Sequence, residues 1–164
     1  MARTNLVIHE ADHARFIDVL QRVGDETNAK FVFLLDKAGQ QIAHTGSLDG
    51  HDLTSLASLT AGNVAATEGL AQLIGENEFS SLFHEGHSDS LHISLISDRV
   101  ILLVIFDEHS SLGLVRLRVK QRTGELGAIV DEIMARAHPA SAQQQVTAAT
   151  FAEITDEDID ALFG

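Results

Sequence analysis

The sequence predicts an α/β domain in which a five-stranded antiparallel sheet has a central helix on one face and two terminal helices on the other. Three observations lead to this fold class. A nearly uncharged helix with clear end signals lies near the middle of the 164 residues. A helix and two strand-like segments precede it. Three strand-like segments and a long helix follow it, and the short connections between these strands make neighbours antiparallel.

The central helix is predicted over 52–75 from its ends and from its lack of charge. Asp52 can cap the first free amide groups, and Gly75 can adopt the left-handed conformation that ends a helix. Glu68 is the only charged residue between them, which is too few charges for a helix with one solvated face. Asn63 and Glu68 argue against a membrane span. The helix is therefore either wholly buried in one core, or buried on one side by its own domain and on another by a second protein.

At 3.6 residues per turn this helix has two apolar stripes and one flat, nearly uncharged face. The first stripe comprises Leu53, Leu56, Ala57, Val64, Ala71 and Ile74, and the second comprises Leu59, Ala66, Leu70 and Leu73. The flat face carries Thr54, Ser58, Ala61, Ala65, Glu68 and Gln72. Gly62 and Gly69 border that face. Because a glycine inside a helix costs about 1 kcal/mol relative to alanine, these glycines suggest close approach by another backbone.

Periodicity and turn residues predict the flanking elements. Apolar residues at spacings of three and four predict helices over 11–26 and from a cap at Ser110 or Ser111 to about Ala137. A strand competes locally over 114–120, but the longer downstream pattern favours a helix. Five strands are predicted at 30–35, 41–45, 78–83, 90–97 and 100–106, with turns at 36–39 and at Asp98-Arg99. The last strand is apolar throughout and should be central in the sheet.

Three segments are expected along the chain. Residues 1–137 form the folded domain, 138–150 a flexible linker rich in Ala, Gln, Ser and Thr, and 151–164 a short amphipathic helix. Ile154 and Ile159 can form a hydrophobic staple at the start of that helix. Because about nine residues cannot hold a helix alone in water, the segment is either a solvated acidic tail or a recognition helix that docks on a partner.

Composition excludes several classes of function. Hydrophobic residues make up 45% of the chain, which is enough for a core, and the absence of cysteine excludes disulfides and thiolate chemistry. A net charge of −13 makes nucleic acids and anionic membranes poor partners. The N-terminus has no apolar signal core, so the cytoplasm is the expected location. No phosphate-binding or dinucleotide-binding glycine motif and no nucleophile elbow is present, so we expect no cofactor and no catalytic residue.

Two polar clusters could still carry chemistry. His84-Glu85-Gly86-His87, followed by His92, could bind a metal, but the spacing matches no known site, and surface histidines are the expected explanation. Basic residues concentrate within 116–122. They are Arg116, Arg118, Lys120 and Arg122. We expect them to be solvated and ion-paired; the alternative is an electrostatic contact for an acidic partner or for the acidic tail.

Five stretches resemble the roadblock family, and within it the bacterial partners of a Ras-like GTPase that controls cell polarity and motility. They are TSLASLTAGNVAA (54–66), LIGENEF (73–79), FHEG (83–86), SLGLVRLRVK (111–120) and FAEITDEDID (151–160). The resemblance implies a roadblock/longin-like α-β-β-α-β-β-β-α sandwich that dimerises through its central helix. It also implies binding to the GTP form of the GTPase and faster hydrolysis, achieved by repositioning the GTPase's own residues. The C-terminal helix would aid binding, with a proposed effect on nucleotide exchange.

Helix geometry and this resemblance together suggest the partner-binding residues. On the central helix we expect Ala61, Ala65, Glu68, Gly69 and Gln72, and in the tail Ile154, Ile159, Leu162 and Phe163. Such a protein would be a cytoplasmic homodimer, enriched at a cell pole, and a regulator rather than an enzyme. Two rival functions remain. One is a scaffold of the same fold that binds a GTPase or motor component without changing hydrolysis, and the other is a small enzyme or metal-binding module that uses 84–92.

Overall fold

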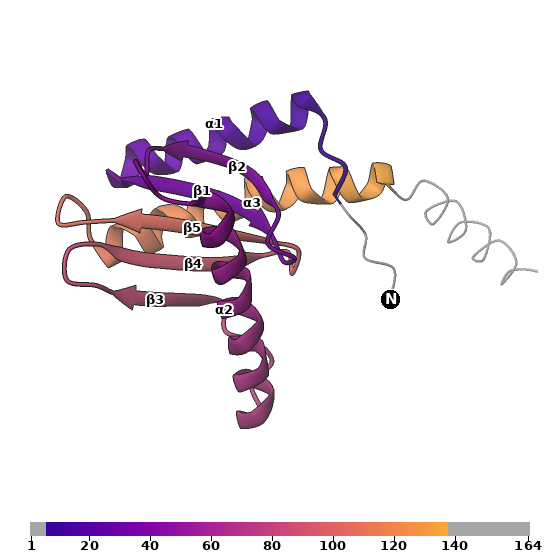
Figure 1. Cartoon of the computed structure of the whole chain (residues 1–164). Coiled ribbons are helices and arrows are strands. Elements are labelled where there is room, and N and C mark those ends of the chain that lie inside the picture. Colours follow the sequence, from indigo (N-terminus) through magenta and orange to yellow (C-terminus); the bar gives the residue numbers. More distant parts are fainter. Residues whose placement is uncertain (1–5, 138–164) are drawn as a thin grey trace, which may run out of the picture. The chain divides into compact units, whose positions relative to one another are not determined.

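The described part of the chain alternates helices and groups of strands (Figure 1). The structure, a computed structural model, describes residues 6–137. Its elements are, in order, α1 (Glu10–Thr27), β1 (Phe31–Asp36), β2 (Gln41–Gly46), α2 (Leu53–Ile74), β3 (Ser81–Glu85), β4 (Ser90–Ile96), β5 (Val100–Phe106) and α3 (Leu112–Ala137). This is the order of helices and strands that the sequence predicts.

The strands form one antiparallel sheet in the order β2-β1-β5-β4-β3. Leu103 at the centre of β5 lies opposite Phe33 of β1 on one side and Ile93 of β4 on the other. Every residue of β5 is buried, which confirms that this apolar segment is the central strand. β2 and β3 are the two edges of the sheet in the described residues.

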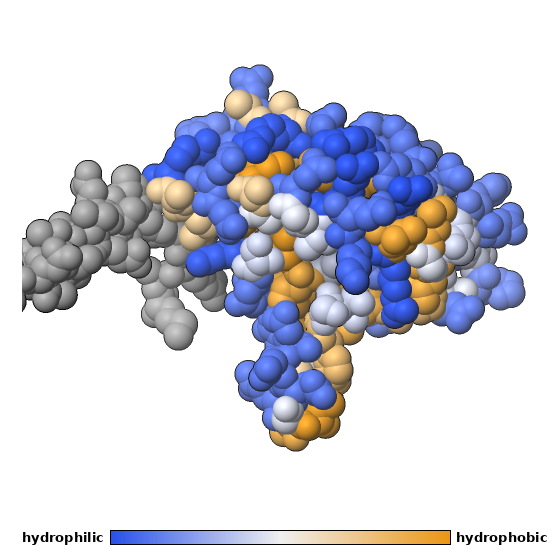
Figure 2. Space-filling view, turned by 180° about the vertical axis from the view of Figure 1, so that it is seen from behind, coloured by the Kyte–Doolittle hydropathy of each residue, from blue (hydrophilic) through white to orange (hydrophobic). Residues whose placement is uncertain are grey.

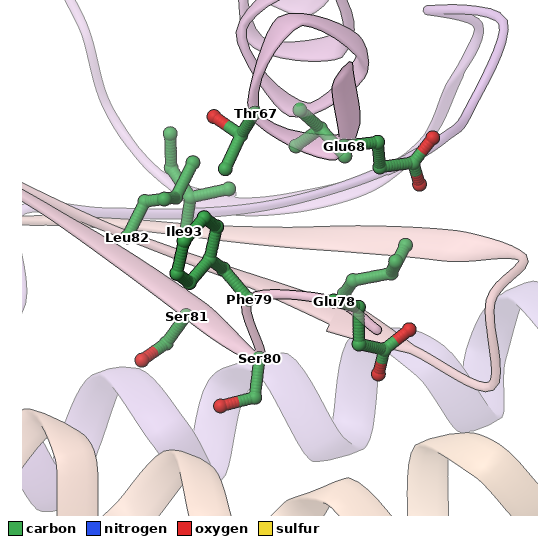
Figure 3. Close-up of a pocket in the computed structure, with 10 residues that line it drawn as sticks. Thr67, Glu68, Glu78, Phe79, Ser80, Ser81, Leu82 and Ile93 are labelled. Carbon is green, nitrogen blue, oxygen red and sulfur yellow. The ribbon is translucent and has the colours of Figure 1, made fainter. Parts of the chain in front are cut away.

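Helix α2 covers one face of the sheet, and α1 and α3 cover the other (Figures 1 and 3). Side chains alternate along a strand, so Phe33 and Leu35 lie with Ala57 of α2 in one buried cluster. Val32 faces the other way, towards Gly24 of α1. The predicted layers are therefore confirmed, and they separate the surface near α2 from the surface near α3.

Charged side chains join α1 to α3. One carboxylate oxygen of Glu125 lies 2.9 Å from Arg22 Nη2, and the other lies 2.9 Å from Arg122 Nη1. Arg122 also pairs with Glu26, and Arg118 Nε lies 3.8 Å from the carboxylate of Glu26. Arg118 and Arg122 are thus ion-paired, as expected from the sequence for the basic residues of 116–122.

The start of β3 and the turn before β5 are the clearest departures from the sequence prediction. β3 begins at Ser81 rather than at Glu78, because the residues before it join the end of α2 to the sheet edge. The turn before β5 has Ser97 and Asp98 at its centre, with φ of 54° and 53°, so the prediction of Asp98 and Arg99 was wrong by one residue. A type I′ turn needs positive φ at both central residues, and its twist matches that of the strands it joins.

The histidines of 84–92 lie in different environments. His84 and His87 are exposed, as expected. His92 is only 2% exposed, so the interpretation as a surface residue is wrong for this position. The physical reason is that the polar side of β4 lies beneath α3, and alternation along the strand cannot indicate which side is covered.

Candidate partner interface on helix α2

The ends of α2 form as the sequence predicts. Asp52 accepts hydrogen bonds from the amide groups of Thr54 and Ser55, at 3.0 and 3.3 Å, and from the Ser55 hydroxyl at 2.6 Å. These hydrogen bonds lower the pKa of Asp52, and the bond from the Ser55 hydroxyl has the largest effect. Gly75 has φ of 78°, and its N–H and that of Glu76 donate to carbonyls of the last turn. Both caps fix the length of the helix and hence the residues on each side.

The side of α2 that packs on the sheet, the inner side, is approached closely by the turn between β1 and β2. Its buried residues are Ala57, Thr60, Ala61, Val64 and Ala71. A Cβ added to Gly39 in that turn would lie 3.3 Å from Cα of Ser58 and 3.6 Å from Cβ of Ala61. Gly39 also has φ of 88°. Glycine therefore allows both the backbone conformation and the close approach.

Replacing Gly39 by alanine should lower the free energy of unfolding by about 1–2 kcal/mol from its left-handed backbone, with a further loss from crowding against α2. Urea unfolding measures the change. Gly50→Ala is the matched control, because Gly50 has φ of 75° and a Cβ there would meet nothing within 4 Å. Equal losses in the two variants would contradict the close packing of the turn on α2.

The opposite side of α2 is apolar and exposed. We call Leu59, Ala66, Leu70 and Leu73 the outer stripe; its three leucines are 74%, 58% and 84% exposed. Ile74 beside it is 67% exposed. Four of the eight large hydrophobic residues that are exposed in the described chain therefore lie on this one helix. Figure 2 shows orange residues along one side and at the tip of the part of α2 that extends beyond the sheet, with blue residues on its other side. Such a concentration marks an interaction surface rather than scattered surface residues.

The predicted partner-binding residues on α2 do not share one environment. Ala65, Gly69 and Gln72 are exposed, Glu68 is half-buried, and Ala61 is 8% exposed within the core cluster. Ala61 therefore offers little surface to a partner. The predicted tail residues Ile154, Ile159, Leu162 and Phe163 lie outside the described residues. Sequence reasoning placed its candidates on the flat face and did not single out the outer stripe, although the second apolar stripe of the helix was a visible signal for it.

Glu68 is held by Lys37 of the turn between β1 and β2. Lys37 Nζ lies 2.8 Å from the carboxylate of Glu68 and 3.0 Å from that of Asp98. Burial alone would lower the pKa of Lys37, but the hydrogen bonds and charges of Glu68 and Asp98 raise it above its ordinary value. A partner that contacts Glu68 therefore meets an ion pair rather than a lone carboxylate.

The edge strand β3 lies beside α2. Asn63 Nδ2 of the helix and His84 Nε2 of the strand are 3.1 Å apart. Phe83 is 36% exposed and stacks on Phe106 of β5, with ring centroids 6.2 Å apart. The outer edge of β3 has no strand partner in the described residues, and unpaired edge groups are available for pairing with another chain. The outer stripe and this edge are two neighbouring features of the exposed surface.

The cavity between α2 and the start of β3 is too small for a substrate. Phe79 lies with Leu82 and Ile93 below Thr67 of α2, around a cavity of about 10 Å³ (Figure 3). That is about the smallest space that holds one water. No group of three or more His, Asp or Glu within 6–137 is arranged to hold a metal. No helix of these residues is long and apolar enough to cross a bilayer. The geometry of this side fits a protein partner.

Comparison with known proteins agrees with this fold. The roadblock/LC7 domain matches residues 16–106. MglB of Myxococcus xanthus is 52% identical, with a TM-score of 0.73, and the match covers 78% of this chain and 96% of that one. MglB of Thermus thermophilus is 35% identical, with a TM-score of 0.71, and 78% and 97% of the chains are covered. An MglB structure described as having a tetrameric arrangement is 34% identical, with a TM-score of 0.73 and coverage of 79% and 97%.

No protein with a curated description matches the chain. The roadblock/LC7 match spans more than half of the residues, and the MglB similarity covers almost the whole of each MglB chain. The chain therefore belongs to the roadblock/LC7 family and is similar to its MglB members.

Proposed function

We propose that this protein is a homodimeric activator of a Ras-like small GTPase of the MglA type, acting in bacterial cell polarity and motility. It binds the GTP form in the cytoplasm, with enrichment at a cell pole, and contributes no catalytic residue. The observation that carries the proposal is the exposed outer stripe of α2, in a chain that is 52% identical to MglB of Myxococcus xanthus. A regulator that works through binding surfaces needs such a stripe and needs no active-site cavity.

Dimerisation through α2 is the first step of the proposal. Covering one exposed leucine stabilises a complex by about 1.5–3 kcal/mol, and a two-fold interface contains each leucine twice. A Cβ at Gly62 would meet nothing within 4 Å, so packing within one chain does not explain this glycine in the helix. Close approach by a second helix explains it. The open edge of β3 beside the helix can extend the same interface.

The GTPase then binds beside the dimer contact. Ala65, Gly69 and Gln72 are exposed on the flat face of α2, and Glu68 with its ion pair lies next to them. The flat face is small and polar, whereas the outer stripe is large and apolar. A second copy of the chain therefore covers the stripe and leaves the flat face accessible. Ala61 borders this contact from the core, and Ile154, Ile159, Leu162 and Phe163 form the apolar face of the recognition helix in the tail.

Activation without a catalytic side chain follows from selective binding. GTP hydrolysis is accelerated by groups positioned around the transferred phosphate, and the GTPase carries those groups itself. A binding surface accelerates the reaction if it favours the conformation in which they are in place. Moving a two-state equilibrium from 1:99 to 99:1 needs affinities that differ by about 10⁴-fold. Contacts with the exposed surface of α2 supply this difference in affinity between the two conformations of the GTPase.

Phosphate release from the Ras-like GTPase of the same genome, with and without this protein, tests the function. We expect a large acceleration that saturates with the concentration of this protein. Binding to the GTP form without acceleration would indicate the scaffold of the same fold instead. If neither form of the GTPase binds, the proposed function is wrong.

Deleting 151–164 should weaken binding to the GTPase while leaving the folded domain intact. The reason is that a tethered helix with an apolar face adds contact area without being part of the core. Titration calorimetry with the GTP-bound GTPase gives the affinity, and thermal unfolding serves as the control for the domain. If the affinity is unchanged, the segment is a solvated acidic tail and not a recognition helix.

A further inference from the structure

A second cavity lies on the opposite face of the sheet from α2. It has a volume of about 480 Å³ and lies between α3 and the strands β3 and β4. Ser81, His92 and Ser94 line it from the sheet, and Arg116 and Lys120 line it from the helix. This volume falls in the range of small-molecule sites. We call it the α3 pocket. The outer stripe and the flat face of α2, which carry the contacts proposed above, lie on the other face of the sheet.

The α3 pocket contains a buried ring nitrogen without a partner. His92 is 2% exposed, and its Nε2 makes no hydrogen bond in the described chain. Its Nδ1 lies 3.4 Å from the hydroxyl oxygen of Ser94. When that hydroxyl donates to Nδ1, the proton of the neutral ring lies on Nε2, which then becomes a donor. A buried donor left unsatisfied is unfavourable, and a bound acceptor would relieve this.

Two cations at the same pocket have no carboxylate partner within residues 6–137. Arg116 and Lys120 lie one turn apart on α3 and both are exposed. No carboxylate of the described residues pairs with either, although the chain has 24 acidic and 11 basic residues. The neighbouring Arg118 and Arg122 both pair with Glu26. In so acidic a chain, two unpaired cations beside a buried donor form an electropositive pocket.

We propose that the α3 pocket binds a small organic anion with a phosphate or carboxylate group. Arg116 and Lys120 contact the charged group, and His92 Nε2 donates to one of its oxygens. Leu117 and Val119 also line the pocket and contact the apolar part of the ligand. Charge-assisted hydrogen bonds of this kind are shorter and stronger than neutral ones.

The protonation of His92 should respond to the ligand. Burial first, and then the charge of Arg116, lower the pKa of His92, so the ring is neutral at pH 7 without ligand. An anion beside Arg116 offsets that charge and raises the pKa of His92. His109 is a reference within the same chain, because its pKa is raised by its hydrogen bond to Asp107 and it lies outside the α3 pocket.

Histidine ring NMR of the full chain, titrated with phenyl phosphate and with inorganic phosphate, tests the proposal. We expect saturable shifts of the His92 signals, a higher pKa for His92 with ligand, and tighter binding of phenyl phosphate than of phosphate. Arg116→Gln and Lys120→Gln should each weaken binding roughly 10-fold or more. Arg99→Gln, which removes an exposed cation outside the pocket, should leave binding unchanged.

Three results would overturn the proposal. One is a linear shift that is the same for His92 and His109. Another is an unchanged affinity in both Arg116→Gln and Lys120→Gln. The third is binding of a peptide of residues 151–164 at His92 without binding of either phosphate probe, which would make the pocket a contact for an acidic segment. The fold of each variant is checked by its far-UV circular dichroism.

Discussion

Replacing Leu70 and Leu73 together by aspartate should convert the homodimer into a folded monomer. Both side chains lie on the outer stripe, and they are 58% and 84% exposed in the single chain, so their loss does not open the core. Each substitution removes about 1.5–3 kcal/mol of apolar burial per copy and adds a carboxylate that must lose water in the interface. The dissociation constant should rise by at least about 10³-fold. Light scattering after size-exclusion chromatography gives the mass in solution.

Leu117→Asp is the matched control for the outer stripe. It makes the same chemical change at a leucine that is 50% exposed, but on α3 rather than on α2. This variant should remain a dimer with unchanged mass. A dimer that survives the double substitution on α2, or that dissociates in Leu117→Asp, would place the contact between copies elsewhere.

Replacing Ala65 by arginine should abolish both binding of the GTPase and activation of hydrolysis. Ala65 is exposed on the flat face of α2, beside Gly69 and Gln72. A long charged side chain there holds the partner away and must lose water on contact, so the affinity should fall by at least about 100-fold. Phosphate release should return to the rate of the GTPase alone. Titration calorimetry and the phosphate assay are made on the same preparation.

The oligomeric state of Ala65→Arg decides how a loss of binding and activation is interpreted. Ala65→Arg should remain a folded dimer, because the outer stripe is unchanged. Ala128→Arg makes the same substitution at an exposed alanine of α3 and should keep both binding and activation. If Ala65→Arg still activates the GTPase, the flat face is not the binding surface. If it becomes monomeric, Ala65 belongs to the dimer contact instead.

The predictions that the structure confirms depend on residues close together in the chain. Asp52 and Gly75 mark the ends of α2 because their interactions involve only the adjacent turn. The central position of β5 follows from its own apolar composition. The turn before β5 was misplaced by one residue because the sequence alone does not indicate which pair of residues takes positive φ.

What only the tertiary structure decided is which side of each element is covered. Local caps, helical periodicity and strand alternation determined the order and class of the elements and the apolar stripes of α2. Burial depends on elements far apart in the chain. Ala61 belongs to the core because the turn at Gly39 packs on it, and the outer stripe is exposed because the sheet contacts the other side of the helix. His92 is buried because α3, which comes later in the chain, covers the polar side of β4.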